Sequence, residues 1–190
     1  MLPELKNQSW QENINGPWLV QADLEPYLSK WSDYEDFELE KFGESEEKRP
    51  LYAVKWGKGK IKIVLWSQMR GNEATATLSI IDIIEFFHHR FIENDEELKE
   101  LSTTISIVFI PMLNPDGAQL FTRRNARLVD MNRDAIKQQS SEMRAFFELI
   151  NRLNPDWAFN LHDQRTIFSV GSHRNCATLS YLAPSPDFAR

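Results

Sequence analysis

Short apolar runs that alternate with helical patterns constrain the fold of this chain more than any other feature. Ile61–Trp66 and 104–110 are apolar almost throughout and rich in β-branched residues, as buried strands are, and 157–161 is predicted as a further strand. Apolar residues recur at helical spacing between these runs. The two helical sets are Ala76, Ile80, Ile83, Ile84 and Phe87, and then Met143, Phe146, Phe147 and Ile150. This order predicts an α/β fold with a mixed, largely parallel central sheet flanked by helices.

The first part of the chain gives weaker signals. Residues 1–45 are mixed and acidic, with possible helical turns around 24–31, and we assign them to an N-terminal extension. Residues 46–190 are assigned to the main domain. Within it, 51–56 and 61–66 flank Gly57-Lys58-Gly59-Lys60, which predicts two strands joined by a tight glycine turn, as in a hairpin.

Composition and charge exclude several classes of function. A net charge of -6 disfavours a nucleic-acid or anionic-membrane partner, although residues 111–190 carry 10 Lys+Arg against 8 Asp+Glu and would suit a small anionic ligand. Cys176 is the single cysteine, so neither an internal disulfide nor a Cys-based zinc site is expected. The sequence shows no signal-peptide pattern and no apolar run of about 20 residues, so we expect a cytoplasmic protein without a membrane span.

Chemically active side chains follow the carboxyl ends of the predicted strands. Glu73 lies after 61–66, a long loop from Asn114 to Arg133 lies after 104–110, and His162 lies after 157–161. Parallel strands bring such positions to one edge of a sheet, where open α/β proteins place their sites. A carboxylate and an imidazole are plausible zinc ligands, and a histidine three residues before Glu73 would complete a set of three. Arg70 stands there instead.

Four sequence blocks carry a family resemblance. They are Ser67-Gln68-Met69-Arg70-Gly71-Asn72-Glu73, Asn114-Pro115-Asp116-Gly117, Arg123-Arg124-Asn125-Ala126 with Asp130-Met131-Asn132-Arg133-Asp134, and Asn160-Leu161-His162-Asp163-Gln164. In order and spacing they resemble the zinc metallocarboxypeptidases of the carboxypeptidase A superfamily, over roughly residues 50–185. The resemblance implies a carboxypeptidase-like fold whose C-terminal part is missing here. It also implies zinc as cofactor and zinc-assisted removal of a peptide's C-terminal residue.

The resemblance also implies a role for individual positions. Glu73 and His162 match two zinc ligands, and Arg70 stands at the position of the missing histidine ligand. Arg123 matches the arginine that polarises the scissile carbonyl. Asn132 and Arg133 match the pair that holds the substrate's terminal carboxylate. Asp130 matches the carboxylate that orients the first histidine.

Arg70 cannot ligate zinc, because a guanidinium stays protonated and has no lone pair to offer. Two interpretations stay open: Arg70 pairs with Glu73 and Asp130 in a metal-free cluster, or a histidine codon has changed in a damaged zinc site. The general base is also unassigned, since no glutamate follows Glu148, and Asp163 and Asp187 are the remaining acidic candidates.

Three functions are consistent with these residues. The first is a zinc metallocarboxypeptidase that hydrolyses peptides by metal-activated water. The second is a non-catalytic module that binds peptide C-termini through Arg123, Asn132 and Arg133. The third is a related amidohydrolase or deacylase on the same scaffold that acts on an acylated amino acid. All three require a ligand with a free carboxylate.

Overall fold

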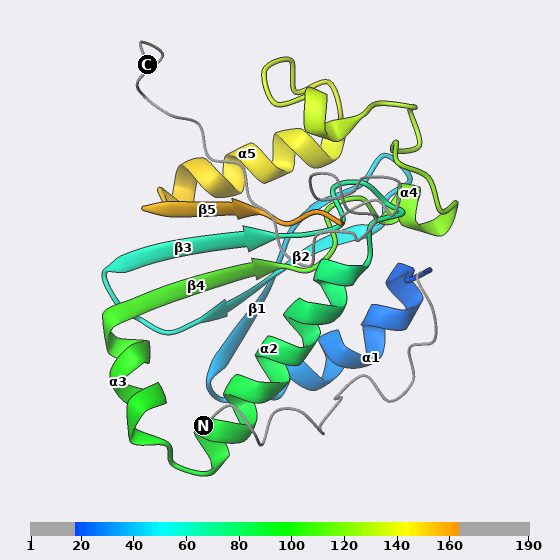
Figure 1. Cartoon of the computed structure of the whole chain (residues 1–190). Helices are drawn as coiled ribbons and strands as arrows, with labels where there is room; N and C mark the ends of the chain where they lie inside the picture. Colours follow the sequence, from blue (N-terminus) through cyan, green and yellow to red (C-terminus); the bar gives the residue numbers. More distant parts are fainter. Residues whose placement is uncertain (1–17, 164–190) are drawn as a thin grey trace, which may run out of the picture.

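A mixed sheet with helices on both faces forms the centre of the molecule (Figure 1). The computed structural model describes residues 18–163. Within this range the sheet has five strands in the order β1-β2-β4-β3-β5. β4, β3 and β5 run parallel to one another, whereas β2 is antiparallel to both β1 and β4. The predicted α/β fold with a mixed central sheet is therefore confirmed.

The helices and strands follow the predicted order closely. Their bounds are α1 Gln21–Ser32, β1 Phe37–Glu44, β2 Pro50–Trp56, β3 Ile61–Trp66, α2 Thr75–Ile92, α3 Glu96–Thr104, β4 Ile105–Ile110, α4 Pro115–Gln119, the 3-10 helix η2 Met131–Arg133, α5 Ser141–Leu153 and β5 Trp157–Asn160. The two long helices expected from apolar spacing are α2 and α5, and the strands predicted at 61–66, 104–110 and 157–161 are β3, β4 and β5.

Two hydrophobic cores lie on opposite faces of the sheet. One packs α1 and α2 against it, with Ile80, Ile81 and Ile84 fully buried. The other packs α5 against β3 and β4, and its helix contributes Met143 and Phe146. Figure 1 shows α5 on one side of the sheet and α1 and α2 on the other. β3 sends alternate side chains into the two cores, which explains why its sequence is apolar on both faces.

The glycine segment after β2 does not close a hairpin, so that prediction is wrong. β4 lies between β2 and β3 and pairs with both. Lys58 and Gly59 donate backbone hydrogen bonds to the carbonyls of Ser102 and Ile105 instead. A Cβ at Gly59 would lie 2.0 Å from the carbonyl carbon of Thr104. The glycines therefore let the chain cross the start of β4, and β2 and β3 diverge to admit that strand.

No sequence signal is strong enough to predict β1. Its residues Phe37–Glu44 pair with β2 over its whole length, so residues assigned above to the N-terminal extension belong to the same sheet. α1 also packs on this sheet, and the buried carboxylate of Glu85 on α2 accepts hydrogen bonds from Trp31 (2.8 Å) and Tyr34 (3.1 Å). Four of the eight residues of β1 are charged, which hides its strand pattern.

Candidate metal and carboxylate site

The carboxyl ends of β3, β4 and β5 meet at one edge of the sheet. Trp66, the last residue of β3, pairs with Ile110 at the end of β4 and with Asn160 at the end of β5. The loops that follow these strands therefore start side by side. This register brings the predicted site blocks together, as the parallel arrangement required.

The loop after β3 is held by buried polar side chains. Gln68 has a left-handed backbone (φ 48) and donates from its Nε2 to the carbonyls of Leu19 (2.8 Å) and Gly71 (2.9 Å). Thr77 on α2 donates to the Gln68 side chain at 2.8 Å. Because these polar groups are buried and partnered, they fix the path of the chain between β3 and α2.

A second contact holds this loop against the loop after β4. The predicted turn at Asn114-Pro115-Asp116-Gly117 begins the short helix α4, whose N-cap Asn114 accepts from the Gly117 N–H at 2.8 Å. A Cβ built on Gly71 would lie 2.0 Å from the carbonyl carbon of Gly117. The two backbones therefore touch, and only glycine at position 71 permits that distance.

Glu73 lies at the centre of the site. Its side chain is almost fully buried, and its two carboxylate oxygens have different partners. Arg70 Nη1 donates to Oε1 at 2.8 Å, and His162 Nδ1 lies 2.7 Å from Oε2. Burial opposes ionisation, but the hydrogen bonds from His162 and Arg70 and their charges outweigh it, so the pKa of Glu73 is lowered from its ordinary value. The carboxylate is therefore held ionised between these two groups.

Asn132 connects the imidazole to the loop before α5. Its Oδ1 lies 3.3 Å from His162 Nε2 and accepts from Asn160 Nδ2 at 3.1 Å. Asn160 is the last residue of β5, so this pair of amides joins that strand to η2. The structure thus brings Asn132, His162, Glu73 and Arg70 into one continuous chain of contacts.

Asp130 meets this chain of contacts at the backbone of Asn132, whose N–H donates to Asp130 Oδ1 at 3.2 Å. Its Oδ2 accepts from Arg123 Nε at 3.0 Å and from Arg123 Nη2 at 2.7 Å, which is a two-pronged ion pair. The predicted contact between Arg70 and Asp130 is therefore wrong, while the predicted contact between Arg70 and Glu73 is present. Arg123 precedes Asp130 by seven residues, so it satisfies the carboxylate from within the same loop.

Arg133 lies on the exposed side of η2. Its backbone N–H is bound to the carbonyl of Asp130 at 2.8 Å, so the start of its side chain is fixed. Within residues 18–163 its guanidinium makes no hydrogen bond or ion pair, whereas the Arg70 and Arg123 guanidinia are both paired with acids. Among the residues that the structure describes, Arg133 is therefore the site arginine with no partner for its guanidinium donors.

The side chains at this site do not fit a zinc ion. Arg70 occupies Glu73 Oε1, and the group at the third position is a cation without a lone pair. Across the described part of the chain, no group of three His, Cys, Asp or Glu side chains is placed to hold a metal. Zinc in hydrolytic sites requires three protein ligands, and only two of the described side chains at this site qualify.

The loop that carries the candidate carboxylate clamp is anchored by residues that the sequence did not single out. Asn125 is buried, and its Oδ1 accepts from the backbone N–H groups of Arg127 (3.1 Å) and Val129 (2.9 Å). Its Nδ2 donates to the fully buried carboxylate of Glu142 on α5 at 3.1 Å. Asn side chains often accept hydrogen bonds from backbone N–H groups a few residues further along a turn. An asparagine in a predicted loop was therefore the sequence signal for this anchor.

Burial raises the pKa of Glu142 above its ordinary value of 4.5, although hydrogen bonds from Asn125 and the backbone oppose the shift. A raised folded-state pKa means that the stability from this group is present below pH 4.5 and is lost as pH rises through the folded value. Glu142→Gln is therefore expected to be nearly neutral at pH 4 and stabilising at pH 7. Urea unfolding at both pH values measures this, and a Glu142→Gln effect equal at the two values would contradict it.

The fold and the site define the class of protein. The mixed α/β sheet gathers a strand-to-helix glutamate, a histidine after a parallel strand and an arginine-rich loop at one edge, which is the arrangement that the resemblance to metallocarboxypeptidases implies. The family model described as zinc carboxypeptidase matches residues 26–177. The chain belongs to the zinc carboxypeptidase family, and the predicted resemblance is confirmed.

Two relatives show how much of the family's length this chain represents. Carboxypeptidase E from Caenorhabditis elegans is 29% identical over 63% of this chain and 30% of its own length. Carboxypeptidase 2 from Trichophyton tonsurans is 29% identical over 55% of this chain and 19% of its own length. The chain therefore spans less than a third of these relatives.

Solved structures share the fold at low identity. The metallo-carboxypeptidase from Burkholderia cenocepacia has a TM-score of 0.70 at 19% identity, covering 76% of this chain and 41% of that one. The metallo-carboxypeptidase from Pseudomonas aeruginosa, in complex with (2-guanidinoethylmercapto)succinic acid, has a TM-score of 0.68 at 21% identity, covering 76% of this chain and 40% of that one.

In residues 18–163, no helix is both long and apolar enough to cross a membrane.

Proposed function

We propose that this carboxypeptidase-like domain binds the C-terminal carboxylate of peptides without metal-dependent hydrolysis. The observation that carries the proposal is the pairing of Arg70 with Glu73, which places a cation where the first zinc ligand is expected. Arg133, in contrast, has an exposed guanidinium and no acidic partner among the described residues. The metal half of the site is thus blocked, while the carboxylate-binding half is open.

The chemistry of Arg133 suits this ligand. A guanidinium presents parallel N–H donors that match the two oxygens of a carboxylate. Asn132 lies next to Arg133 on η2, and its side-chain amide contacts His162 and Asn160. These contacts hold η2, and therefore the start of the Arg133 side chain, in place. Support also comes from the similar Pseudomonas aeruginosa protein, which was solved with a succinic acid derivative.

The proposal predicts that a free C-terminal peptide binds more tightly than its amidated twin. One charge-assisted contact contributes roughly 1.5–3 kcal/mol, so the expected difference is about 10-fold or more. Fluorescence anisotropy with labelled peptides measures it. Arg133→Gln is expected to remove the difference, whereas Arg152→Gln, on the C-terminal half of α5, is expected to keep it. Equal affinities for the two peptides in the parent chain would rule the function out.

Metal-dependent hydrolysis is the second candidate, and the contact between Glu73 and His162 at 2.7 Å favours it. Two ligand-type side chains already converge there, so a third donor from outside the described residues would complete a set. Mass spectrometry of peptides and of acylated amino acids, incubated with the chain and zinc, separates peptidase from deacylase activity. Release of either product only when zinc is added would favour this candidate over carboxylate binding alone.

A further inference from the structure

The loops before α5 form a cationic surface on an acidic protein. Residues 120–144 contain six Lys or Arg and three Asp or Glu, although the whole chain has a net charge of -6. The three acids are occupied. Asp130 is paired with Arg123, Asp134 accepts from buried backbone and hydroxyl groups, and Glu142 is fully buried. The charge presented to solvent here is therefore that of the basic side chains.

Two of these basic side chains converge on one oxygen. Arg127 Nη1 donates to the carbonyl of Gln139 at 3.3 Å, and Arg144 Nη1 donates to the same oxygen at 2.6 Å. The two nitrogens therefore lie within about 6 Å of each other. Like charges at such a distance repel, and an anion between them would relieve the repulsion.

Most of the donors on this arginine pair remain available. A guanidinium has five N–H groups, and Arg127 uses one of them on Gln139. Arg144 also binds Gln138 and Ser141 and keeps the rest. Both side chains are exposed. Two acids of the described residues interact with the pair: Glu46 Oε1 lies 3.7 Å from Arg127, and Asp134 interacts electrostatically with Arg144. Both acids also accept backbone N–H groups, so the exposed guanidinium donors remain for a further anion.

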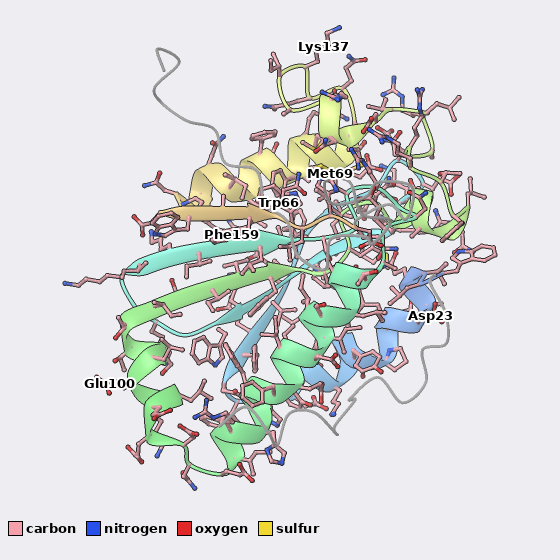
Figure 2. All side chains as sticks on the ribbon, in the orientation of Figure 1. Asp23, Trp66, Met69, Glu100, Lys137 and Phe159 are labelled. Carbon is pink, nitrogen blue, oxygen red and sulfur yellow. The ribbon has the colours of Figure 1, made fainter. Side chains whose placement is uncertain are left out.

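The loop 134–140 links Arg133 to the carbonyl oxygen that the arginine pair shares. The carboxylate of Asp134 accepts from the backbone N–H groups of Gln139 (2.9 Å) and Ser140 (2.9 Å), which closes the loop 134–140 at its base. Figure 2 shows Lys137 at the outer end of this loop, away from the sheet. Arg133 precedes the closure, and the Gln139 carbonyl that holds Arg127 and Arg144 lies within it.

We infer that Arg127 and Arg144 form a second anion subsite, which selects peptides with an acidic side chain close to the C-terminal carboxylate. Two guanidinia suit a carboxylate or a phosphate group, so the side chain is Asp, Glu or a phosphorylated residue. The selection of peptides rests on the proposed binding of C-terminal carboxylates by Arg133. The subsite itself rests only on the geometry of the two arginines.

Inorganic phosphate tests the subsite without any peptide. Titration followed by NMR or calorimetry is expected to show binding to the parent chain that weakens at least about fivefold in Arg127→Gln and in Arg144→Gln. Arg152→Gln is the matched control, because Arg152 lies on the same helix about 12 Å further along and its side chain is 57% exposed, as is that of Arg127. If Arg144→Gln weakens phosphate binding no more than Arg152→Gln does, the subsite is overturned.

Peptides then test the selection. Among peptides with a free C-terminus, Glu or phosphoserine near that end is expected to bind at least about fivefold more tightly than Gln or Ser, and Arg144→Gln is expected to erase the difference. A Glu-to-Gln ratio within twofold in the parent chain overturns the selection. The comparison of free with amidated peptides tests the proposed function alone. Equal affinities in that comparison would contradict the proposed function, and the phosphate titration would still decide whether the subsite exists.

Discussion

Arg70→His is expected to bind zinc more tightly than the parent chain, in which we propose that Arg70 blocks the metal position. The substitution removes a cation that occupies Glu73 Oε1 and supplies a donor beside Glu73 and His162, which already lie 2.7 Å apart. A set of two histidines and one glutamate is a common catalytic zinc site. Loss of even a supporting partner typically changes metal affinity 10–100-fold, so the gain from a full ligand is expected to exceed about 100-fold. Metal analysis after dialysis and competition with a zinc-binding dye measure it.

Arg70→Gln is the control for this experiment. It also removes the positive charge but offers an amide, which is a poor zinc ligand. If the gain comes from the new imidazole, Arg70→Gln is expected to stay free of zinc. Stoichiometric zinc in the parent chain would sink the proposal of a blocked site, and equal zinc in the glutamine and histidine variants would show that charge alone excludes the metal.

Gly71→Ala is expected to destabilise the domain by about 3 kcal/mol or more, since overpacking costs typically 1–3 kcal/mol and here the obstacle is backbone. The added Cβ would lie 2.0 Å from Gly117 C and 2.2 Å from the N–H nitrogen of Ala118. Relief requires the loop after β3 and the start of α4 to separate, which would also displace Glu73. Urea unfolding measures the loss, and loss of peptide binding in the folded fraction would accompany it.

Asn72→Ala tests whether the effect comes from this close approach rather than from any change in the loop. The Asn72 Oδ1 atom has no hydrogen-bond partner among the described residues, so its removal is expected to cost less than about 1 kcal/mol. A similar loss of stability in Asn72→Ala and Gly71→Ala would contradict the role assigned to the contact between Gly71 and Gly117.

The identity and order of most secondary structure could be predicted because the signals are local. α2, α5 and the strands β3, β4 and β5 each carry their periodicity in a short segment. β1 was missed, since its pairing with β2 is stabilised by contacts that its charged sequence does not reveal. The hairpin prediction was wrong because two strands joined by a glycine segment can either pair with each other or leave room for a third strand between them. The contacts of that segment with Ser102–Ile105 decide for the second arrangement.

The candidate site divides in the same way. Arg70, Glu73 and His162 could be named from spacing along the chain, and their contacts agree with the predicted grouping. The partner of Asp130 could not be predicted from the sequence, because both Arg70 and Arg123 were candidates. The structure pairs Asp130 with Arg123. The arginine pair on the Gln139 carbonyl has no sequence pattern at all.

The sequence by itself determined the strand-to-helix position of Glu73 and the chemical fact that Arg70 cannot hold zinc, which follow from residue type and local spacing. Its four blocks also carried the resemblance to the family, which the family model confirmed. Tertiary structure decided which charges meet: Arg70 with Glu73, Arg123 with Asp130, and Arg127 beside Arg144. Ion pairs depend on distances of a few ångströms between segments that the backbone brings together, and no pattern along the chain encodes those distances.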